Sequence, residues 1–373
     1  MTRTEHLHEC IVLWFALSAS CGSGFVIPHV VVVGKVIIDE YRKPCEDPRT
    51  TSIGTRISIG GGGPQAAFGA AAALAVILGD DFSDPPSAQS VSFVGPVGGV
   101  DWTDREDTAL CELLGAAIKS IHVVKGENLR TPRIQLWHDD EQNVQWRALN
   151  DSFGAEGADG LWNNRPCADE IMQIIGEDRK VICHAVMEGG AQSPGSGQDI
   201  AFLKNTEIQQ RIDFLGIEPV TFADEATRIV SVQDAATCMQ RIQQLSSLLK
   251  CVSPDMHLYK AVAEGEWTNL EVGVRDGPRG SLFIGTSGEP ILIPAASLST
   301  SDGRPVNPTG AGNAYSAALT VSRGLGLSTF DAACIASAVG AVLCEYNHIP
   351  PWTSTVIARI REATDEVRSA GIK

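Results

Sequence analysis

The hydrophobic pattern of the chain alternates between short β-branched runs and longer alanine-rich segments. Residues 30–38 form an apolar run that begins Val30-Val31-Val32-Val33, which is typical of a parallel strand buried on both faces. Residues 65–78 and 313–321 are rich in alanine, lack proline and are followed by glycine, which predicts helices. Further strands are predicted at residues 55–59, 91–95, 180–184, 213–217, 270–274, 282–284 and 291–293, and further helices at 107–119, 229–250 and 328–344.

The order of these elements predicts the fold class. Strands alternate with helices from Val30 onward, and no Gly/Ser/Pro-rich linker is long enough to divide the chain. Residues 133–137 and 144–147 alternate between apolar and polar side chains around a polar turn, which predicts a hairpin. We therefore expect residues 29–373 to form one α/β domain, a three-layer α/β/α sandwich on a mostly parallel sheet.

The N-terminal residues 1–28 do not fit this alternation. Residues 11–17 are an apolar run with the length of a signal-peptide core, too short to cross a membrane. The preceding residues are not basic, because Arg3 is offset by Glu5 and Glu9. We treat residues 1–28 as an N-terminal extension, for which a targeting segment and an artefact of the gene model both stay open.

The net charge of −16 over 373 residues narrows the expected partners. An acidic protein is a poor match for nucleic acid and for anionic membrane surfaces, both of which need basic faces. ATP is not excluded, because a few local donors and Mg²⁺ can offset phosphate charge. The ten cysteines contain no Cys-x-x-Cys pair, which favours reduced thiols in a cytoplasmic compartment over a disulfide framework or a zinc site.

A glycine-rich turn before the second alanine-rich helix is the strongest candidate for a binding site. Residues 307–315 read Asn-Pro-Thr-Gly-Ala-Gly-Asn-Ala-Tyr, and glycine lets the backbone approach a ligand closely. The helix start leaves amide groups without intrahelical acceptors and carries the positive end of the helix dipole. The turn therefore predicts an anion hole suited to phosphate. The alternative is an ordinary glycine-containing loop before a buried helix.

A second glycine pattern matches part of a dinucleotide-binding fingerprint, but the sequence around it does not. Gly61-x-Gly63-x-x-Ala66 follows a predicted strand, as the dinucleotide fingerprint does. That fold also needs a second buried strand about twenty residues on, ending in an acid that binds the ribose. Here that distance falls on Asp80 and Asp81, directly after the helix and before a polar loop. The context therefore excludes a dinucleotide-binding unit.

Residues 307–315 resemble the signature Asp-Thr-x-Gly-Ala-Gly-Asp of the ribokinase-like (PfkB-type) carbohydrate kinases. In that family the final Asp takes the proton from the substrate hydroxyl as it attacks the γ-phosphate of ATP. This sequence has Asn313 at that position and Asn307 at the first, and an amide is not a base near neutral pH. The resemblance implies an anion hole and catalytic position formed by Gly310, Ala311, Gly312 and Asn313.

The resemblance covers about residues 30–363 and implies further roles. The predicted hairpin corresponds to part of a small β-lid over the substrate site. Glu218 is the nearest charged substitute for the family's Asn-x-x-Glu, which positions Mg²⁺ and is absent here. The implied substrate-binding residues are Asp39, Gly61, Gly62, Gln65 and Arg133. The implied nucleotide-binding residues are Asp276, Gly277, Gly280, Asn307 and Thr309.

Two hypotheses of function remain open on the sequence. The first is a kinase that uses ATP and Mg²⁺, both implied by the resemblance, to phosphorylate a hydroxyl of a sugar, nucleoside or related small molecule. The second is a catalytically silent protein that binds nucleotide or sugar and has a regulatory or scaffolding role. The departures at residues 307 and 313 and the missing Asn-x-x-Glu all fall on the catalytic machinery. A cytoplasmic location and a homodimer are further expectations.

Overall fold

The structure is a computed structural model. It describes residues 27–41, 56–79, 90–127, 130–138, 144–149, 166–176, 181–188, 200–220, 230–245, 247–286, 289–298, 307–346 and 349–371. All but two residues of the predicted N-terminal extension (1–28) therefore lie outside the described residues.

A nine-stranded sheet forms the centre of the described fold, and its strands follow the order β13-β12-β11-β10-β9-β8-β1-β4-β5. The strands from β5 to β11 pair in parallel, and β12 and β13 are antiparallel at one edge. Their bounds are β1 His29–Val33, β4 Val91–Gly98, β5 Ser120–Gly126, β8 Val181–Glu188, β9 Ile212–Val220, β10 Leu249–Val252, β11 Glu271–Arg275, β12 Ser281–Ile284 and β13 Pro290–Ile293.

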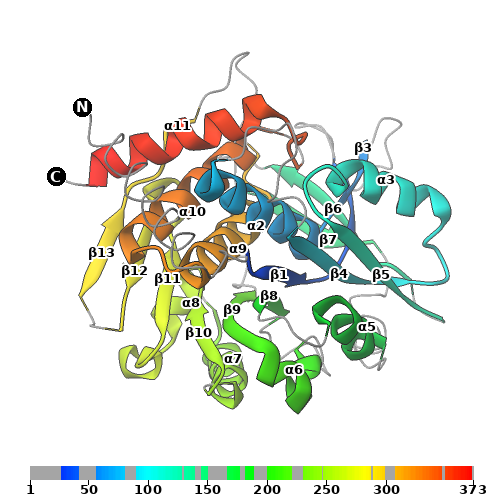
Figure 1. Cartoon of the computed structure of the whole chain (residues 1–373), viewed down its shortest axis with the longest axis horizontal. Coiled ribbons are helices and arrows are strands. Elements are labelled where there is room, and N and C mark those ends of the chain that lie inside the picture. Colours follow the sequence, from blue (N-terminus) through cyan, green and yellow to red (C-terminus); the bar gives the residue numbers. More distant parts are fainter. Residues whose placement is uncertain are drawn as a thin grey trace, which may run out of the picture.

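Helices cover both faces of this sheet, which makes the three-layer α/β/α sandwich that the sequence predicts (Figure 1). In β1, Val30 and Val32 pack with one layer and Val31 and Val33 with the other, so this strand is buried on both faces as predicted. One layer holds α2 Gly62–Leu78, α3 Asp104–Leu114, α9 Ala311–Gly324, α10 Thr329–Cys344 and α11 Ser354–Gly371. The other holds α5 Pro166–Ile175, α6 Thr206–Arg211, α7 Val232–Gln244 and α8 Met256–Ala261.

The apolar run at residues 30–38 is divided between two sheets. After β1 the chain leaves the large sheet at Gly34, and β2 Ile37–Tyr41 enters a second sheet with the order β3-β2-β6-β7. This sheet also contains β3 Arg56–Gly60, β6 Arg133–His138 and β7 Val144–Ala148. The antiparallel pairing of β6 with β7 confirms the predicted hairpin. The prediction of one continuous strand over residues 30–38 is wrong, because β2 pairs with β3 and β6 instead of extending β1.

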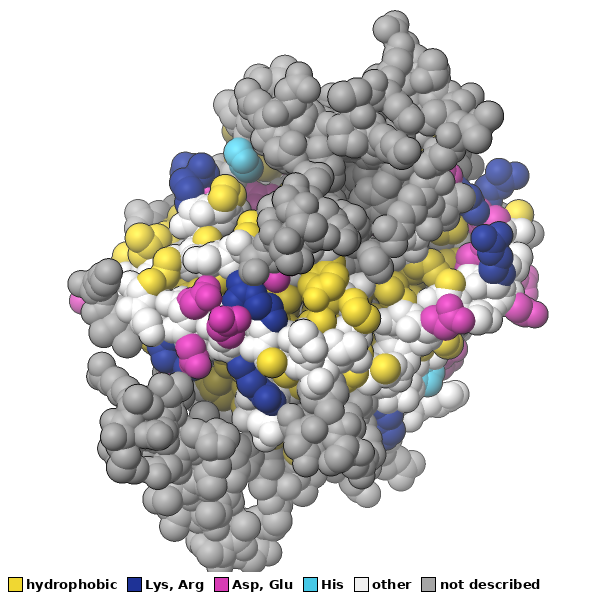
Figure 2. Space-filling model, turned by 90° about the horizontal axis from the view of Figure 1, so that it is seen from above, with side chains coloured by type: hydrophobic (Ala, Val, Ile, Leu, Met, Phe, Trp, Pro, Cys, Tyr) yellow, Lys and Arg dark blue, Asp and Glu magenta, His cyan; other side chains and the backbone are white. Residues whose placement is uncertain are grey.

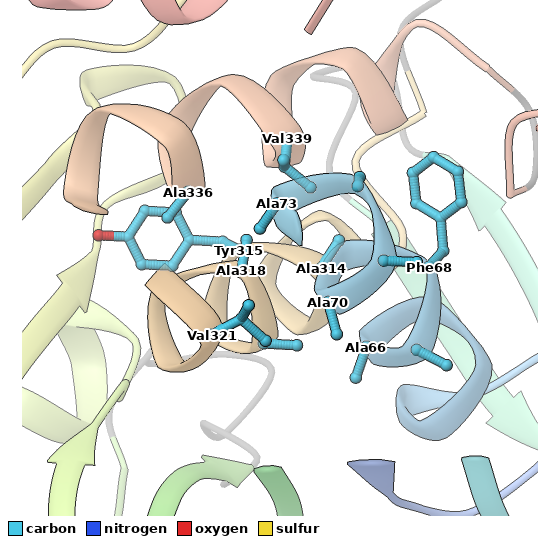
Figure 3. Packing of buried hydrophobic residues seen from close by; sticks show 14 of the residues in the cluster. Ala66, Phe68, Ala70, Ala73, Ala314, Tyr315, Ala318, Val321, Ala336 and Val339 are labelled. Carbon is cyan, nitrogen blue, oxygen red and sulfur yellow. The ribbon is translucent and has the colours of Figure 1, made fainter. Parts of the chain in front are cut away.

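The alanine-rich helices α2 and α9 pack directly on each other in the middle of their layer (Figure 3). A β-carbon at Gly69 would collide with the backbone of Ala314, so the two helix backbones are as close as small residues allow. Figure 3 shows Ala70 and Ala73 on the α2 side of this contact and Ala318 on the α9 side. The tight packing fixes the start of α9 relative to the start of α2.

Two predicted helices differ most from the structure in their bounds. α3 begins three residues earlier than predicted, behind a capping box of Thr103 and Glu106, and ends before Gly115. The predicted helix at residues 229–250 is α7 followed by β10, because Leu249–Val252 pairs in parallel with β9 and β11. No helix in the described ranges is long and apolar enough to cross a membrane.

Among the described residues, the surface on the α11 side carries a mixture of side-chain types (Figure 2). Figure 2 shows apolar side chains in the middle of this face, with acidic and basic side chains in small mixed groups around them.

Candidate functional site

The two sheets meet at a pair of glycine segments that follow β1 and β3. The amide of Gly63 donates to the carbonyl of Lys35 at 3.1 Å. A β-carbon at Gly34 would collide with the backbone of Gly63, so the two segments touch. This contact lies at the carboxyl end of β1, the edge where open α/β sheets bind ligands. Gly61 has φ 93°, a left-handed conformation that glycine adopts without strain, and α2 begins directly after it.

Asp39 is buried at this junction. It lies in the middle of β2, opposite Ser58 of β3 and Ile134 of β6, and it is 1% exposed. Its Oδ1 has no hydrogen-bond partner in the described structure, and a β-carbon at Gly60 would collide with its Oδ2. Burial raises the pKa of Asp39 to about 8, so the carboxyl is largely protonated at neutral pH. A buried carboxyl with an oxygen that lacks a partner is costly, which is typical of a group that completes its hydrogen bonds with a ligand.

The start of α9 has the geometry of an anion hole. Gly310 precedes the helix with φ 85°, and the amide of Ala314 donates to its carbonyl at 3.0 Å. The amide of Ala311 donates to the carbonyl of Pro308 at 3.2 Å. The amides of Gly312 and Asn313 have no acceptor within the described part of the chain. Those two donors lie at the positive end of a 14-residue helix.

The turn before α9 is held by Asn307 and Thr309. The amide of Asn307 donates to the carbonyl of Cys344 at the end of α10, at 3.0 Å. Its side-chain Oδ1 accepts from the amide of Thr309 at 3.1 Å. The Oγ1 of Thr309 is buried and has no partner in the described ranges. Asn307 therefore shapes the turn, and Thr309 offers a hydroxyl next to Gly310.

Contacts between side chains connect the start of α9 to the Asp39 junction. A β-carbon at Gly310 would collide with the amide group of Gln65 on α2. A β-carbon at Gly62 would lie 2.9 Å from the Nδ2 of Asn313. The structure therefore places Gln65 and Gly62 against the glycine turn, although they are about 250 residues away from it along the chain.

Asn313 belongs to a cluster with Glu218 and Arg275. Its Nδ2 donates to Oε2 of Glu218 at 2.9 Å, and Nη1 of Arg275 donates to the other oxygen, Oε1. Glu218 is 1% exposed and lies within β9, which runs three residues beyond the strand predicted at 213–217. Burial raises the pKa of Glu218, and the charge of Arg275 and the two hydrogen bonds oppose that rise.

Arg275 connects this cluster to the turn between β11 and β12. It is the last residue of β11, and a β-carbon at Gly312 would collide with its Nη1. The turn that follows has Gly277 at φ 55° and Gly280 at φ 96°, and a β-carbon at Gly277 would meet open space. Asp276 accepts two hydrogen bonds from the exposed Arg279, which lowers the pKa of Asp276. The turn predicted to bind nucleotide thus begins directly after Arg275, whose guanidinium lies against the start of α9.

Arg133 is the predicted substrate residue that the structure separates from Asp39. Its guanidinium lies 3.8 Å from Glu40 and 3.9 Å from Asp101. Neighbouring residues of a strand point to opposite faces, so the side of β2 that carries Glu40 is opposite to the side that carries Asp39. Arg133 therefore lies on the face of the small sheet that is opposite to Asp39.

No protein-family model and no curated protein matches the sequence, but solved structures match the fold. A ribokinase from Giardia lamblia has a TM-score of 0.59 at 18% identity, over 92% of this chain and 99% of that one. A nucleoside kinase from Burkholderia thailandensis in complex with inosine has a TM-score of 0.58 at 18% identity, over 90% of this chain and 96% of that one. Phosphofructokinase-2 from Escherichia coli has a TM-score of 0.57 at 14% identity, over 93% of this chain and all of that one. The fold is ribokinase-like.

The ribokinase-like fold raises the question of whether Glu218 fits a Mg²⁺ ion. Both carboxylate oxygens of Glu218 are occupied, one by a guanidinium and one by an amide, and both donors repel a cation from the same oxygens. Within the described ranges no group of three or more His, Cys, Asp or Glu side chains could hold a metal ion. Glu218 therefore does not fit the metal-ligand role that the sequence predicts.

The sequence does not identify the contacts that Arg275 makes with Glu218 and with the start of α9. The residue stands directly before the Asp-Gly-x-x-Gly turn, and a charged residue at the end of an apolar strand is the available signal. That signal does not identify the partner of Arg275, because Glu218 is 57 residues away along the chain. Only the pairing of β9, β10 and β11 in the sheet brings the two side chains together.

Proposed function

We propose that this chain is a small-molecule kinase that transfers the γ-phosphoryl group of ATP to a hydroxyl of a sugar, a nucleoside or a related compound. One observation carries the proposal: the contact between Gly62 and Asn313 brings the junction that holds Asp39 up to the anion hole at the start of α9. A kinase needs this juxtaposition, because the acceptor hydroxyl and the phosphoryl group must meet.

The residues divide into two halves of one site. Asp39, Gly61, Gly62 and Gln65 would receive the acceptor, and the buried carboxyl of Asp39 would exchange hydrogen bonds with its hydroxyl groups. The amides of Gly312 and Asn313 would receive phosphate oxygens, with Asn307 and Thr309 shaping the turn. The open turn of Asp276, Gly277 and Gly280 would lie along the nucleotide. ATP would supply the phosphoryl group. The resemblance also implies Mg²⁺, but Glu218 is not proposed as its ligand.

Phosphoryl transfer without a carboxylate at residue 313 should be slow. Its transition state is loose, so positioning and charge stabilisation supply most of the catalysis, and the anion hole provides both. A general base contributes about 10²–10⁴-fold in rate, and Asn313 cannot provide it. The neighbouring Glu218 is not proposed as the base, because it is 1% exposed and its two oxygens hold Arg275 and Asn313.

A second candidate function, binding without transfer, is favoured by the hydrogen bond from Asn313 to Glu218. That bond fixes the amide as a donor to the protein, so Nδ2 does not face the acceptor. In this alternative the chain binds nucleotide or sugar and acts through its bound state, in a regulatory or scaffolding role.

Two measurements test the proposal in sequence. Calorimetric titration with ATP and ADP asks whether nucleotide binds, and a screen of sugars and nucleosides with radiolabelled ATP asks whether phosphate is transferred. Binding with slow transfer to one acceptor class supports the kinase. Binding without transfer to any acceptor supports the second candidate. An absence of nucleotide binding contradicts the kinase, and an absence of binding to both nucleotides and sugars contradicts both candidates.

The kinase proposal carries two further expectations. ATP is the donor, so the protein should be located in the cytoplasm, which cell fractionation checks. A homodimer remains a prediction, and sedimentation velocity of the purified protein measures it.

A further inference from the structure

We propose that the guanidinium of Arg275 is the cation that faces phosphate at the start of α9, and that Glu218 holds this arginine instead of a divalent metal. The inference rests on the proposed function, because it assigns the charge that would stabilise the phosphate in that site. It predicts that the phosphate part of the ligand binds without a divalent ion.

The position of Arg275 is the first support. Its Nη1 lies so close to Gly312 that a β-carbon there would collide with it. The free amide of Gly312 belongs to the same turn of helix, so an anion bound there would lie beside the guanidinium. Its side chain is 16% exposed, so its edge reaches the surface. Arginine with helix-start amides is a donor set that matches phosphate oxygens.

The unused donors of Arg275 are the second support. Of its guanidinium nitrogens, only Nη1 has an acceptor in the described part of the chain, and Nε is buried without one. A guanidinium has five N–H donors, so several remain for a ligand. The neighbouring His184 does not share the role, because burial and the charge of Arg275 lower its pKa to about 3 and leave it neutral.

Glu218 acts as a positioning residue in this arrangement. One oxygen fixes the guanidinium and the other fixes the amide of Asn313, so both side chains keep one orientation at the start of α9. A metal ion would have to displace both donors from a carboxylate that is 1% exposed. The arginine therefore holds a carboxylate oxygen that a metal ion at Glu218 would need.

The test uses tripolyphosphate, a phosphate chain without a base or sugar, titrated by calorimetry into the full-length protein in EDTA. The single substitution Arg275→Met leaves a buried carboxylate unpaired and endangers folding. The informative pair is therefore Glu218→Gln, which keeps the arginine, and the double variant Arg275→Met/Glu218→Gln, which removes both charges. Arg105→Met, at an exposed position on α3, is the matched control for one lost positive charge. Thermal unfolding checks that each variant is folded.

The proposal expects tripolyphosphate to bind wild type, Glu218→Gln and Arg105→Met in EDTA. The double variant should bind at least about tenfold more weakly, which is the size of one lost charge-assisted hydrogen bond. Equal binding by Glu218→Gln and the double variant, or wild-type binding only with Mg²⁺, overturns the inference.

A parallel titration with ATP separates this inference from the proposed function. If ATP binding requires Mg²⁺ and has the same affinity with and without Arg275, the kinase proposal stands and the phosphate-binding role of Arg275 is overturned. If tripolyphosphate binds in a way that depends on Arg275 but neither ATP nor ADP binds, the phosphate-binding role of Arg275 is supported and the nucleotide site is overturned. If neither compound binds under any condition, both proposals fail.

Discussion

Two buried carboxyl groups, Asp39 and Glu218, lie on either side of the contact between Gly62 and Asn313, and they differ in their partners. Each is 1% exposed. Glu218 accepts one hydrogen bond on each oxygen, from Arg275 and Asn313. The Oδ1 of Asp39 has no partner among the described residues. The same type of group is therefore satisfied by the protein at one position and unsatisfied at the other.

The difference separates a structural carboxylate from a binding carboxyl. Burial raises the pKa of both groups, but only at Glu218 do a cation and two donors oppose that rise. At Glu218 each oxygen already accepts a hydrogen bond from the protein, so the group is satisfied without a ligand. Asp39 is neutral when it is protonated, and its Oδ1 remains available to hydrogen-bond a ligand hydroxyl.

The largest expected effect is the pH dependence of stability that arises from Asp39. Its pKa is about 8 in the folded protein against 3.8 for the ordinary group, so between these values the folded state binds one more proton than the unfolded state. The free energy of unfolding should therefore fall as pH rises from about 4 to about 8, by roughly 5 kcal/mol at 1.36 kcal/mol per pKa unit. Urea denaturation at a series of pH values measures this slope.

Asp39→Asn removes the titrating group and should remove that component of the slope. Asp104→Asn, at an exposed carboxylate on α3, is the matched control and should leave the slope in place. If Asp39→Asn and wild type have the same slope, Asp39 is not the uncompensated carboxyl described above.

The second effect comes from breaking the pair at Glu218. Arg275→Met leaves a buried carboxylate without its cation and should lower the free energy of unfolding by about 3–5 kcal/mol. Arg279→Met, four residues on in an exposed ion pair, is the matched control and should leave stability unchanged. Chemical denaturation compares the two variants, and equal stabilities would show that Glu218 does not depend on Arg275.

The sequence predicts the local parts of this account. The apolar strand at Val30, the alanine-rich helices and the glycine turn before α9 all follow from periodicity, alanine content and glycine placement within one segment. The hairpin of β6 and β7 is also local, because only five polar residues separate its two strands in the sequence. Residues near one another in sequence determine each of these features.

The remaining features depend on pairing over long distances. The run at residues 30–38 is apolar except for Gly34 and Lys35, and these two residues alone do not show that Ile37 starts a strand of another sheet. Leu249–Val252 follows a helix pattern and becomes a strand because β9 and β11 flank it. The pairing of Glu218 with Arg275 requires three neighbouring strands, and a single sequence does not specify their order.

The third effect concerns the rate of phosphoryl transfer. Asn313→Asp alone would set a carboxylate against Glu218, and two like charges in contact would destabilise the fold. The double variant Asn313→Asp/Glu218→Gln exchanges the amide and the carboxylate, so the hydrogen bond between them is kept. The new carboxylate should supply the missing base and raise the rate by about 10²–10³-fold, the lower half of the range for a general base.

A coupled assay for ADP release, run with the acceptor found in the screen, measures this rate. Glu218→Gln alone is the matched control, since it changes the charge at residue 218 and adds no base. A brisk wild-type rate that the double variant does not increase would show that another residue is the base.

The most direct test of the kinase-type site is the affinity of Gly312→Val for ATP, measured by calorimetry beside the wild type. The new side chain would collide with Nη1 of Arg275 beside the first turn of α9, where phosphate is proposed to bind. The clash falls on Nη1 of Arg275, which can move only by loosening its hydrogen bond to Glu218, so circular dichroism first checks that the variant is folded. The account predicts that wild type binds ATP and that folded Gly312→Val does not. Equal affinity in the folded variant would contradict the site.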